Sequence, residues 1–286
     1  MKPTVAFVIL TWNSASYIAD CLCSVFALSA INPLVYVMNN GSTDQTGEIL
    51  EEFASQYAER MEITTFTENM GTTIPRNLAM KKAKNTADWI CVLDSDTVIN
   101  DPAILRLIEV MEQNDKAMAA VPRMWNADNE EQLSCKKFPT IIGKLRKAIP
   151  IKSVQLKGAE KETYSFFPDK NKIGTPPISK DTNVYPVDYG ISACWFLRNI
   201  VLEKVGYMDE KYFYAPEDVD YCVQIWKSGY QILFVSDSSI YHLTQRLSQK
   251  KIFSKMNVSH IRGLLHFFKQ HRKYLRLHRK MKGIKE

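Results

Sequence analysis

The sequence predicts an α/β protein: a doubly wound, mainly parallel sheet flanked by helices and followed by a basic helical tail. Two observations predict this fold. Through the first 120 residues, short β-branched apolar runs alternate with segments of helical periodicity, which is typical of parallel strands joined by right-handed helical crossovers. Polar residues follow each of the first four predicted strands, at the edge where open α/β sheets bind their ligands.

Each element of the first half has its own signal. The first predicted strand, Thr4–Leu10, is a continuous β-branched apolar run, typical of a strand buried on both faces. The next three predicted strands are Leu34–Met38, Met61–Phe66 and Trp89–Leu93. The helices between them are predicted from capping residues, glycine and proline: one capped by Asn13 or Ser14 and ending before Pro33, one from Ser42 to Tyr57, one from the loop of Gly71 to Lys84, and one starting at Pro102.

The second half is less regular. From about Trp125 to Tyr185 the periodicity is lost, and a long irregular stretch inside a domain is typical of a functional loop or a mobile lid. Strand and helix patterns return from VYPVDYGISACWFLR to SGYQILFV. The last forty residues have helical periodicity, with these apolar residues set among Lys, Arg and His: Ile261, Leu264, Leu265, Phe267 and Phe268.

Charge is distributed unevenly along the 286 residues. The formal net charge is +6, yet residues 246–286 carry 13 Lys and Arg against one acid, a net +12 that leaves −6 on the remainder. Cations interleaved with Phe and Leu are typical of a helix on a membrane surface or of an arm that binds nucleic acid. The alternative is a solvated helix that packs its apolar stripe on the body.

Several classes of protein and site are disfavoured. The six cysteines are sparse and lie partly in apolar runs, which argues against a disulfide framework, and the absence of a Cys-X-X-Cys pair argues against a structural zinc site. The apolar run at the N-terminus is too short for a signal peptide, and no run of 18 apolar residues predicts a spanning helix. A cytosolic protein with reduced thiols is expected.

The motif VLDSDT places Asp94 and Asp96 directly after an apolar strand. Because side chains alternate along an extended backbone, both carboxylates point the same way at the carboxyl edge of the sheet. Two carboxylates there can hold a divalent cation that neutralises a diphosphate. The alternative is a polar loop in which one aspartate caps the helix that starts near Pro102.

Two further motifs carry side chains suited to chemistry. The motif APEDVDYC holds Glu217, Asp218 and Asp220 at a helix start, where the helix dipole alone can explain acidic residues. In a partly dehydrated cleft, one of these carboxylates could instead act as a general base. His242 follows a strand-like segment; it is a candidate metal ligand if Asp96 binds a metal, and otherwise a structural residue.

The loops after the first three strands hold further polar residues that could converge at the same sheet edge. They are Thr11, Asn13, Asn39, Asp44, Asn69, Gly71, Arg76 and Asn77. Ordinary capping and turn chemistry is the alternative for each of them taken singly.

Taken in order, these motifs resemble the family 2 glycosyltransferases of GT-A fold, in particular the rhamnosyltransferase-like branch of polysaccharide-assembly enzymes. The matching stretches are VAFVILTWNSASYIADCLCSV, VYVMNNGSTDQTGEIL, ENMGTTIPRNLAMKKA, WICVLDSDTVI, the segment from VDYGISACWF to IWKSGY, and SIYHL. They cover roughly residues 4–245, apart from the central stretch. The resemblance implies a GT-A domain over residues 1–245 and a basic amphipathic helical tail over 246–286. The domain would comprise a nucleotide-binding half (1–122), an insertion or mobile loop (123–185) and an acceptor and catalytic-base half (186–245).

The resemblance also implies roles for individual residues. Asp96, with Asp94 and His242, would bind Mn²⁺ or Mg²⁺, and Asp94 would also face the ribose and phosphates of the nucleotide. Asp218 is the expected base, ahead of Glu217. The residues framing the nucleotide would be Thr11, Asn13, Asn39, Asp44, Asn69, Gly71 and Arg76.

Two positions depart from the family pattern. Asn39 stands where family members commonly have an acidic residue that reads the N3–H of the base. An Asn carbonyl can still accept that bond, so the donor is left open between a dTDP-sugar and a UDP-sugar. Ser192, beside the bulky Trp195, replaces a usual glycine on the acceptor side, which leaves the acceptor open.

The expected reaction is an inverting transfer of a hexose or deoxyhexose from the nucleotide-sugar to a hydroxyl of a saccharide acceptor, in cell-surface polysaccharide assembly. If the acceptor is lipid-linked, the tail is expected to bind an anionic membrane surface and not nucleic acid. The protein would then be a cytoplasmic enzyme, peripheral at the inner face of the plasma membrane.

Three other functions are alternatives to this one. A nucleotidyltransferase would need a Gly-rich, basic loop after the first strand, and TWNSASY is neither. A dehydrogenase would need Gly-X-Gly-X-X-Gly there, which is absent. The non-enzymatic alternative is a catalytically degenerate GT-A domain that acts as a membrane-associated assembly scaffold.

Overall fold

The structure, a computed structural model, describes residues 1–148, 164, 183–243 and 255–281. Within these residues the main sheet has ten strands, in the order β3-β2-β1-β4-β11-β6-β12-β5, with β7 beside β6 and β9 beside β12. The strands of the first half are β1 (Thr4–Thr11), β2 (Asn32–Asn40), β3 (Met61–Phe66), β4 (Trp89–Asp94), β5 (Thr97–Val98) and β6 (Ala117–Trp125). Those of the second half are β7 (Glu131–Gln132), β8 (Cys135–Lys136), β9 (Val184–Val187), β10 (Tyr189–Gly190), β11 (Cys194–Arg198) and β12 (Gln231–His242).

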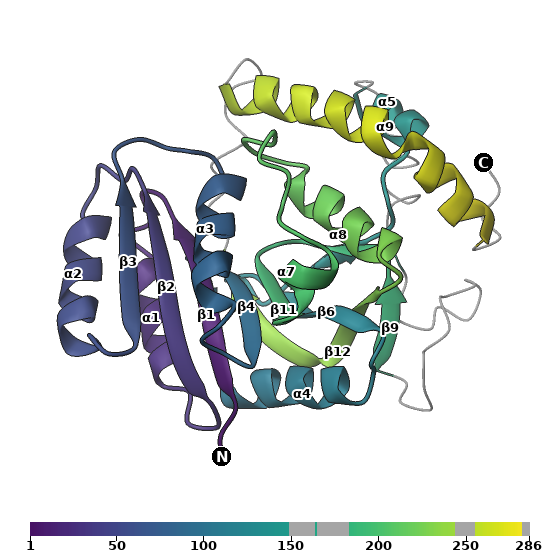
Figure 1. Cartoon of the computed structure of the whole chain (residues 1–286). Helices are drawn as coiled ribbons and strands as arrows, with labels where there is room; N and C mark the ends of the chain where they lie inside the picture. The colour runs from purple at the N-terminus through teal and green to yellow at the C-terminus, as the bar shows by residue number, and fades with distance from the viewer. Residues whose placement is uncertain (149–163, 165–182, 244–254, 282–286) are drawn as a thin grey trace.

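Helices cover both faces of this sheet (Figure 1). They are α1 (Ile18–Phe26), α2 (Thr46–Gln56), α3 (Thr73–Ala83), α4 (Asp101–Glu112), α5 (Ile141–Ala148), α7 (Val201–Lys204), α8 (Glu217–Lys227) and α9 (Lys255–Met281). The buried side chains of α1 and α4 belong to the core on one face, and those of α3, α7, α8 and α9 to the core on the other. None of the helices in the described part of the chain is long and apolar enough to cross a membrane.

The sheet is mainly parallel, with one antiparallel strand in its centre and three short antiparallel strands, β5, β7 and β9, beside β12 or β6. Strands β1 to β4 are parallel to one another, as predicted, and β6 is parallel to β12. Strand β11 lies antiparallel between β4 and β6, so that residues 194–198 join two halves that are separated in sequence. The carboxyl ends of β1 and β4 therefore lie side by side, at Leu10 and Asp94.

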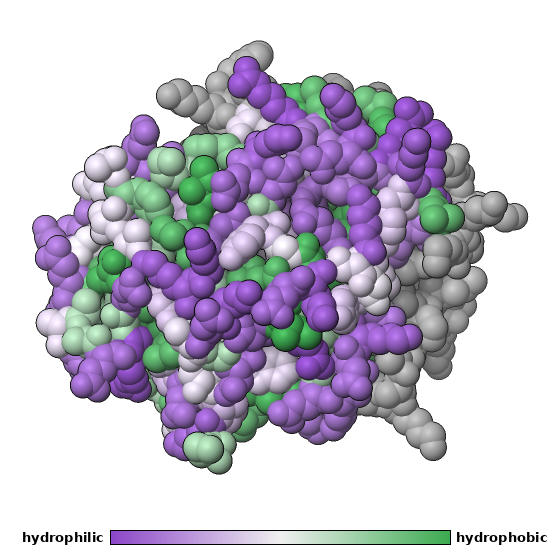
Figure 2. Space-filling model, viewed as in Figure 1, coloured by the Kyte–Doolittle hydropathy of each residue, from purple (hydrophilic) through white to green (hydrophobic). Residues whose placement is uncertain are grey.

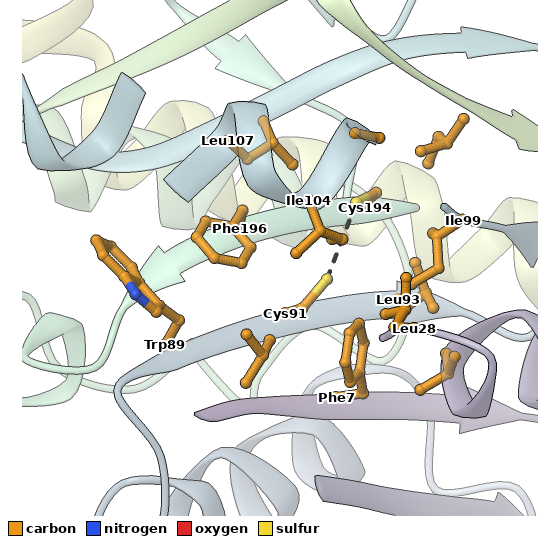
Figure 3. Packing of buried hydrophobic residues seen from close by; sticks show 14 of the residues in the cluster. Phe7, Leu28, Trp89, Cys91, Leu93, Ile99, Ile104, Leu107, Cys194 and Phe196 are labelled. Atoms are coloured by element: carbon orange, nitrogen blue, oxygen red, sulfur yellow. Dashed lines mark hydrogen bonds between the residues drawn. The ribbon is translucent and has the colours of Figure 1, made fainter. Parts of the chain in front are cut away.

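The core follows the alternation of the strands. In β1, Val5, Phe7 and Ile9 face one layer of helices, whereas Ala6 and Val8 face the other. Figure 3 shows side chains of three neighbouring strands beneath α4: Phe7, Cys91, Cys194 and Phe196 on the strands, with Ile104 and Leu107 on the helix. All six cysteines are free thiols, and the two in this cluster lie with their sulfur atoms 4.0 Å apart.

The element boundaries agree closely with the sequence patterns except at the starts of the first two helices: α2, predicted from Ser42, begins at Thr46. Neither Asn13 nor Ser14 caps the first helix, because α1 begins four residues after Ser14. Asn13 has a positive φ of 49°, and its side-chain oxygen accepts the backbone N–H of Thr43 at 2.8 Å. These polar residues tie the loop after β1 to the loop after β2, which explains why they do not start a helix. By contrast, Asn100 does cap α4, accepting the N–H of Ala103 at 2.9 Å.

The irregular stretch 123–185 is described only in part. It contains the end of β6, strands β7 and β8, helix α5 and the start of β9. Residues 149–163 and 165–182, where a mobile loop was predicted, lie outside the described residues. The predicted tail begins at residue 246, and its described part is helix α9.

Candidate active site

Asp94, Asp96 and His242 come together at the carboxyl edge of the sheet. Asp94 ends β4, Asp96 follows it in a turn, and His242 ends β12, so the fold unites residues that are far apart in sequence. One ligand atom from each lies within 4.8 Å of the other two. Two carboxylates and an imidazole suit Mn²⁺ or Mg²⁺, so these residues fit the divalent ion that the sequence predicts.

His242 is held by a partner on each side of its ring. Nε2 lies 3.3 Å from Oδ1 of Asp96, and Nδ1 lies 2.8 Å from Oε1 of Gln132. Burial lowers the pKa of His242, but the hydrogen bond to Asp96 and the charges of Asp96 and Asp94 outweigh burial, so the pKa is raised above its ordinary value. A cation bound by this imidazole must therefore displace a proton more often than at a free histidine.

Arg76 bridges the two halves of the site. Its side chain is only 4% exposed; Nη2 donates to Oδ1 of Asp94 at 2.6 Å and Nη1 to Oε1 of Glu217 at 3.2 Å. Nη1 also donates to the hydroxyl of Ser192 at 3.0 Å. Burial raises the pKa of Asp94, the charge of Arg76 opposes that rise, and the charge of Asp96 adds to it, with a net increase. Two carboxylates already oppose the charge of the Arg76 guanidinium. It can therefore bind a further anion, such as a diphosphate held by a metal, only with the part of its charge that they leave unneutralised.

The two acids that begin α8 lie in different environments. Glu217 is buried against Arg76, and its second oxygen, Oε2, has no hydrogen-bond partner. Asp218 is half-buried and bonds through Oδ1 to the N–H of Val219 at 2.7 Å. Burial, together with the charge of Glu217, raises the pKa of Asp218 to about 7. A carboxylate with this pKa suits a general base at neutral pH, whereas Glu217 is engaged as an ion-pair partner.

These side chains line one cavity of about 240 Å³. Its walls come from the carboxyl edge of the sheet, the start of α3, the loop before β11 and the loop before α8. The lining residues are Leu10, Thr72, Arg76, Asp94, Ile191, Ser192, Ala193, Tyr214, Ala215, Glu217, Asp218 and His242. A cavity that joins acids, an arginine and an imidazole can bind an anionic ligand through a cation and present a base to a second substrate.

The remaining predicted nucleotide residues lie outside the walls of this cavity. Thr11 and Asn39 are buried at the ends of β1 and β2, and the hydroxyl of Thr11 has no partner. Asp44 accepts the N–H groups of Ala15 and Thr46, which holds the two loops together. The side-chain oxygen of Asn69 accepts the N–H of Gly71 at 2.9 Å. Thr11 directly follows Leu10, which lines the cavity, and Asn39 is opposite Thr11 on β2. The role of these residues toward a nucleotide stays a prediction.

Two other residues singled out in the sequence have structural partners. Asn77 bonds to Met208 and Glu210, and Asp220 is a buried residue in the first turn of α8, the helix that starts with Glu217. The sequence reasoning missed Gln132, which orients His242, because it lies in the irregular stretch. It also missed Thr72 and Tyr214, whose only signal was their position beside Gly71 and the acidic motif.

Known proteins resemble this chain in sequence. Poly-beta-1,6-N-acetyl-D-glucosamine synthase of Staphylococcus epidermidis is 27% identical over 147 residues, which are 50% of this chain and 35% of that protein. The probable glycosyltransferase YdaM of Bacillus subtilis is 25% identical over 201 residues, which are 70% of this chain and 40% of that protein. The chain therefore matches less than half the length of each of these relatives.

Solved structures and a family model agree with these relatives. The crystal structure of GalNAc-T7 with UDP, GalNAc and Mn²⁺ matches with a TM-score of 0.66 at 12% identity, covering 96% of this chain and 50% of that one. S. aureus TarS 1–349 matches with a TM-score of 0.56 at 18% identity, covering 84% and 60%. The predicted GT-A fold is thereby confirmed. The model of glycosyl transferase family 2 matches residues 6–174, more than half of the sequence, and the chain belongs to that family.

Proposed function

We propose that this protein is an inverting, metal-dependent glycosyltransferase that moves a sugar from a nucleotide-sugar to an acceptor hydroxyl. The observation that carries the proposal is the shared cavity, where the candidate metal ligands Asp94 and His242 lie with Asp218. A base whose pKa is about 7, placed opposite a site for a bound diphosphate, is what direct displacement at an anomeric carbon requires.

In the proposed mechanism, Asp94, Asp96 and His242 would hold Mn²⁺ or Mg²⁺. The ion, when bound, supplies positive charge that stabilises the leaving nucleoside diphosphate. Arg76 adds a fixed guanidinium to the same group, from a buried position that needs little reorganisation. Asp218 accepts the proton of the acceptor hydroxyl as its oxygen attacks the anomeric carbon in line with the departing diphosphate, which inverts the configuration.

The donor is a UDP-sugar or a dTDP-sugar, with a hexose or deoxyhexose as the transferred group. Structures of GalNAc-T7 and TarS that contain UDP support a uridine nucleotide at a GT-A site of this kind. The acceptor is a saccharide carried on a lipid during polysaccharide assembly. A putative teichuronic acid biosynthesis glycosyltransferase of Bacillus subtilis, 27% identical over 118 residues, supports this class.

A donor screen tests the function. Purified protein with Mn²⁺ and a panel of nucleotide-sugars should release nucleoside diphosphate from one of them when an acceptor is present. A catalytically degenerate scaffold is the alternative, and it is distinguished by thermal unfolding. UDP, dTDP or GDP should raise the melting temperature only when the metal is present, and a protein with neither turnover nor this stabilisation would be a scaffold.

The pH dependence follows from the environment of Asp218. Because burial raises the pKa of this carboxyl to about 7, it is protonated and inactive as a base at lower pH. Turnover should therefore rise with pH through a midpoint near 7. Measuring kcat/KM at saturating Mn²⁺ suppresses the separate effect of protonating His242. A rate that is flat from about pH 5 to about pH 9 would contradict this role for the carboxyl.

We also propose that the tail lies on an anionic membrane. Helix α9 packs one side on the body, burying Phe267 and Leu275, as the alternative reading of the tail expected. Its other side exposes Ile261 at 59% and Leu265 at 69%. Helix α5 exposes Ile141, Ile142 and Leu145 in the same way. At the top of Figure 2, where Figure 1 places both helices, hydrophobic and hydrophilic residues lie side by side.

The charge of these two helices complements an anionic surface. Neither α5 nor α9 contains an acidic residue, and the outward side of α9 carries Arg262, Lys269, Arg272, Lys273 and Arg276. The charge of Lys144 on α5 reaches His260 on α9, so the two helices are neighbours. Each cation near an anionic leaflet contributes on the order of 1 kcal/mol, which is enough together for reversible binding.

Charge reversal tests the membrane proposal. The triple variant Lys269→Glu, Arg272→Glu, Arg276→Glu should lower binding to vesicles of phosphatidylserine and phosphatidylcholine about 100-fold or more, at about 1 kcal/mol for each lost cation. The matched control reverses three exposed lysines elsewhere: Lys81, Lys116 and Lys204. Equal binding by the two triple variants in a sedimentation assay would refute the proposal, because net charge alone would then explain the affinity.

A further inference from the structure

Helix α9 packs against the loop that carries the proposed base. This base loop, residues 212–218, leads into α8 and supplies Tyr214, Glu217 and Asp218 to the cavity. Figure 1 shows α9 lying across α8 and the loop before it. The contacts between α9 and this loop involve buried polar groups and backbone atoms, which distinguishes them from the basic outer side of the same helix.

The strongest contact fixes both ends of the base loop at one carboxylate. Oδ1 of Asp220 accepts the hydroxyl of Tyr212 at 2.9 Å and Nε2 of His271 at 2.6 Å. Nδ1 of His271 lies 2.7 Å from Nζ of Lys227, so the lysine donates to Nδ1 and the ring donates from Nε2. Tyr212 starts the loop, and Asp220 lies in the first turn of the helix after it. The Tyr212–Asp220 bond therefore ties the two ends together, and His271 of α9 holds the carboxylate that makes this bond.

A second contact is steric and lies in the middle of the loop. A Cβ at Gly263 of α9 would lie 2.8 Å from the carbonyl oxygen of Ala215 and 3.0 Å from Cδ of Pro216. The ring of His260 donates through Nδ1 to the same carbonyl at 3.1 Å. Only glycine allows the helix to come this close to the backbone two residues before Glu217. Across the loop, the N–H of Thr72 bonds to the carbonyl of Phe213 at 2.8 Å, so the loop is held from both sides.

We infer that α9 is a positioning element for catalysis: His271, through Asp220, and the close approach at Gly263 set the position of Asp218 relative to the acceptor. This inference rests on the proposed function, in which Asp218 is the base. Removing the imidazole would leave the buried carboxylate of Asp220 short of one of its donors, and the loop would shift to find another. A displacement of about 1 Å at a reacting group can lower the rate about 100-fold.

The chain contains a matched control on the same helix. His278 also donates from a buried ring to a buried aspartate, with Nε2 lying 3.1 Å from Oδ1 of Asp188. That aspartate accepts the backbone N–H of Phe138 at 2.8 Å, and its own backbone N–H donates to the hydroxyl of Tyr164, so these hydrogen bonds join segments other than residues 212–218. His271→Ala and His278→Ala therefore remove the same kind of interaction from α9, and only the first one acts on the loop.

Two measurements test the inference. In His271→Ala and Gly263→Ala, kcat should fall about tenfold or more with donor affinity unchanged, and His271→Gln, whose amide can still donate to Asp220, should recover much of the rate. His278→Ala should keep its kcat. Hydrogen exchange of the amides of residues 212–220, which needs no substrate, should become faster in His271→Ala and Gly263→Ala but not in His278→Ala.

The outcomes separate this inference from the proposed function. Equal exchange and equal kcat in His271→Ala and His278→Ala would overturn it, and so would faster exchange without loss of rate. A parallel loss of donor affinity would also overturn it, because the effect would then lie in the nucleotide site. A wild-type protein that turns over no nucleotide-sugar would instead reject the proposed function.

Discussion

Replacing Asp218 with Asn is expected to lower the rate of sugar transfer about 10²–10⁴-fold, the usual contribution of a general base. The amide keeps the size and the backbone hydrogen bond of the side chain but cannot accept the acceptor's proton. Donor binding should stay nearly intact, because within the described part of the chain the Asp218 side chain bonds to the N–H of Val219 and forms no ion pair with Arg76 and no hydrogen bond with the candidate metal ligands. Turnover under saturating donor and titration with the nucleoside diphosphate measure the two effects separately.

The variant Glu217→Gln is the comparison that identifies the base. Glu217 is paired with Arg76, so its loss should loosen the guanidinium and weaken donor binding more than it lowers kcat. The reverse pattern, with kcat lost in Glu217→Gln and kept in Asp218→Asn, would assign the base to Glu217.

The folding of Asp218→Asn is checked at about pH 8. The Asp218 carboxyl of the wild type is charged at this pH, and because its pKa is raised in the folded state, that charge lowers the stability of the wild type. The melting temperature of Asp218→Asn should be no lower than that of the wild type there.

Replacing Asp96 with Ala is expected to abolish metal-dependent binding of the nucleoside diphosphate and to lower turnover about 100-fold or more. A bound ion supplies several kcal/mol of charge stabilisation, and about 1.4 kcal/mol corresponds to tenfold in rate. Asp96 is buried and bonded to His242, so its loss removes one ligand and releases a second. Titration calorimetry with Mn²⁺, and melting temperature with Mn²⁺ and UDP, measure the loss.

Asp88 supplies the control for this variant. It lies at the opposite end of β4, where its carboxylate accepts the N–H of Thr4 at 2.8 Å, so Asp88→Ala also removes a hydrogen-bonded acid from the sheet. It should keep the metal response. In the wild type, the affinity for Mn²⁺ should fall as the pH falls, since the raised pKa of His242 makes the proton a stronger competitor. Metal-dependent stabilisation that survives in Asp96→Ala would remove Asp96 from the ligand set.

The part of the fold that the sequence predicts well is the part built from local patterns. Strands β1 to β4 alternate with segments of helical periodicity, so their existence and parallel direction follow from residues close together in sequence. The position of β11 could not be predicted in this way. Its apolar run fits any buried strand, and only the completed sheet shows that it lies between β4 and β6 in the antiparallel direction.

The candidate site shows the same division. Asp94 and Asp96 are two residues apart, and the sequence analysis expected them to converge through the alternation of a strand. They do converge, but for another reason: β4 ends at Asp94, and the turn that follows it carries Asp96. The meeting of Arg76 with Glu217, 141 positions later, depends on how α3 and α8 pack on one face, which no local pattern encodes. The helical periodicity of the tail predicted α9. The burial of His271 and His278 could not be predicted, because their aspartate partners, Asp220 and Asp188, lie on other elements. The role of Gln132 could not be predicted for a similar reason, since its partner, His242, ends a strand that is distant in sequence.

The place of β11 in the sheet has a consequence for how the chain folds during synthesis. Until residues 194–198 leave the ribosome, β4 and β6 have no strand between them and both present unpaired edges. At about 5–20 residues per second, β11 is completed several seconds after β6. The nascent N-terminal half therefore has open strand edges at β4 and β6 during this interval, and open edges can pair with other chains. A fragment that stops before β11 should aggregate even though it holds most of the parallel strands.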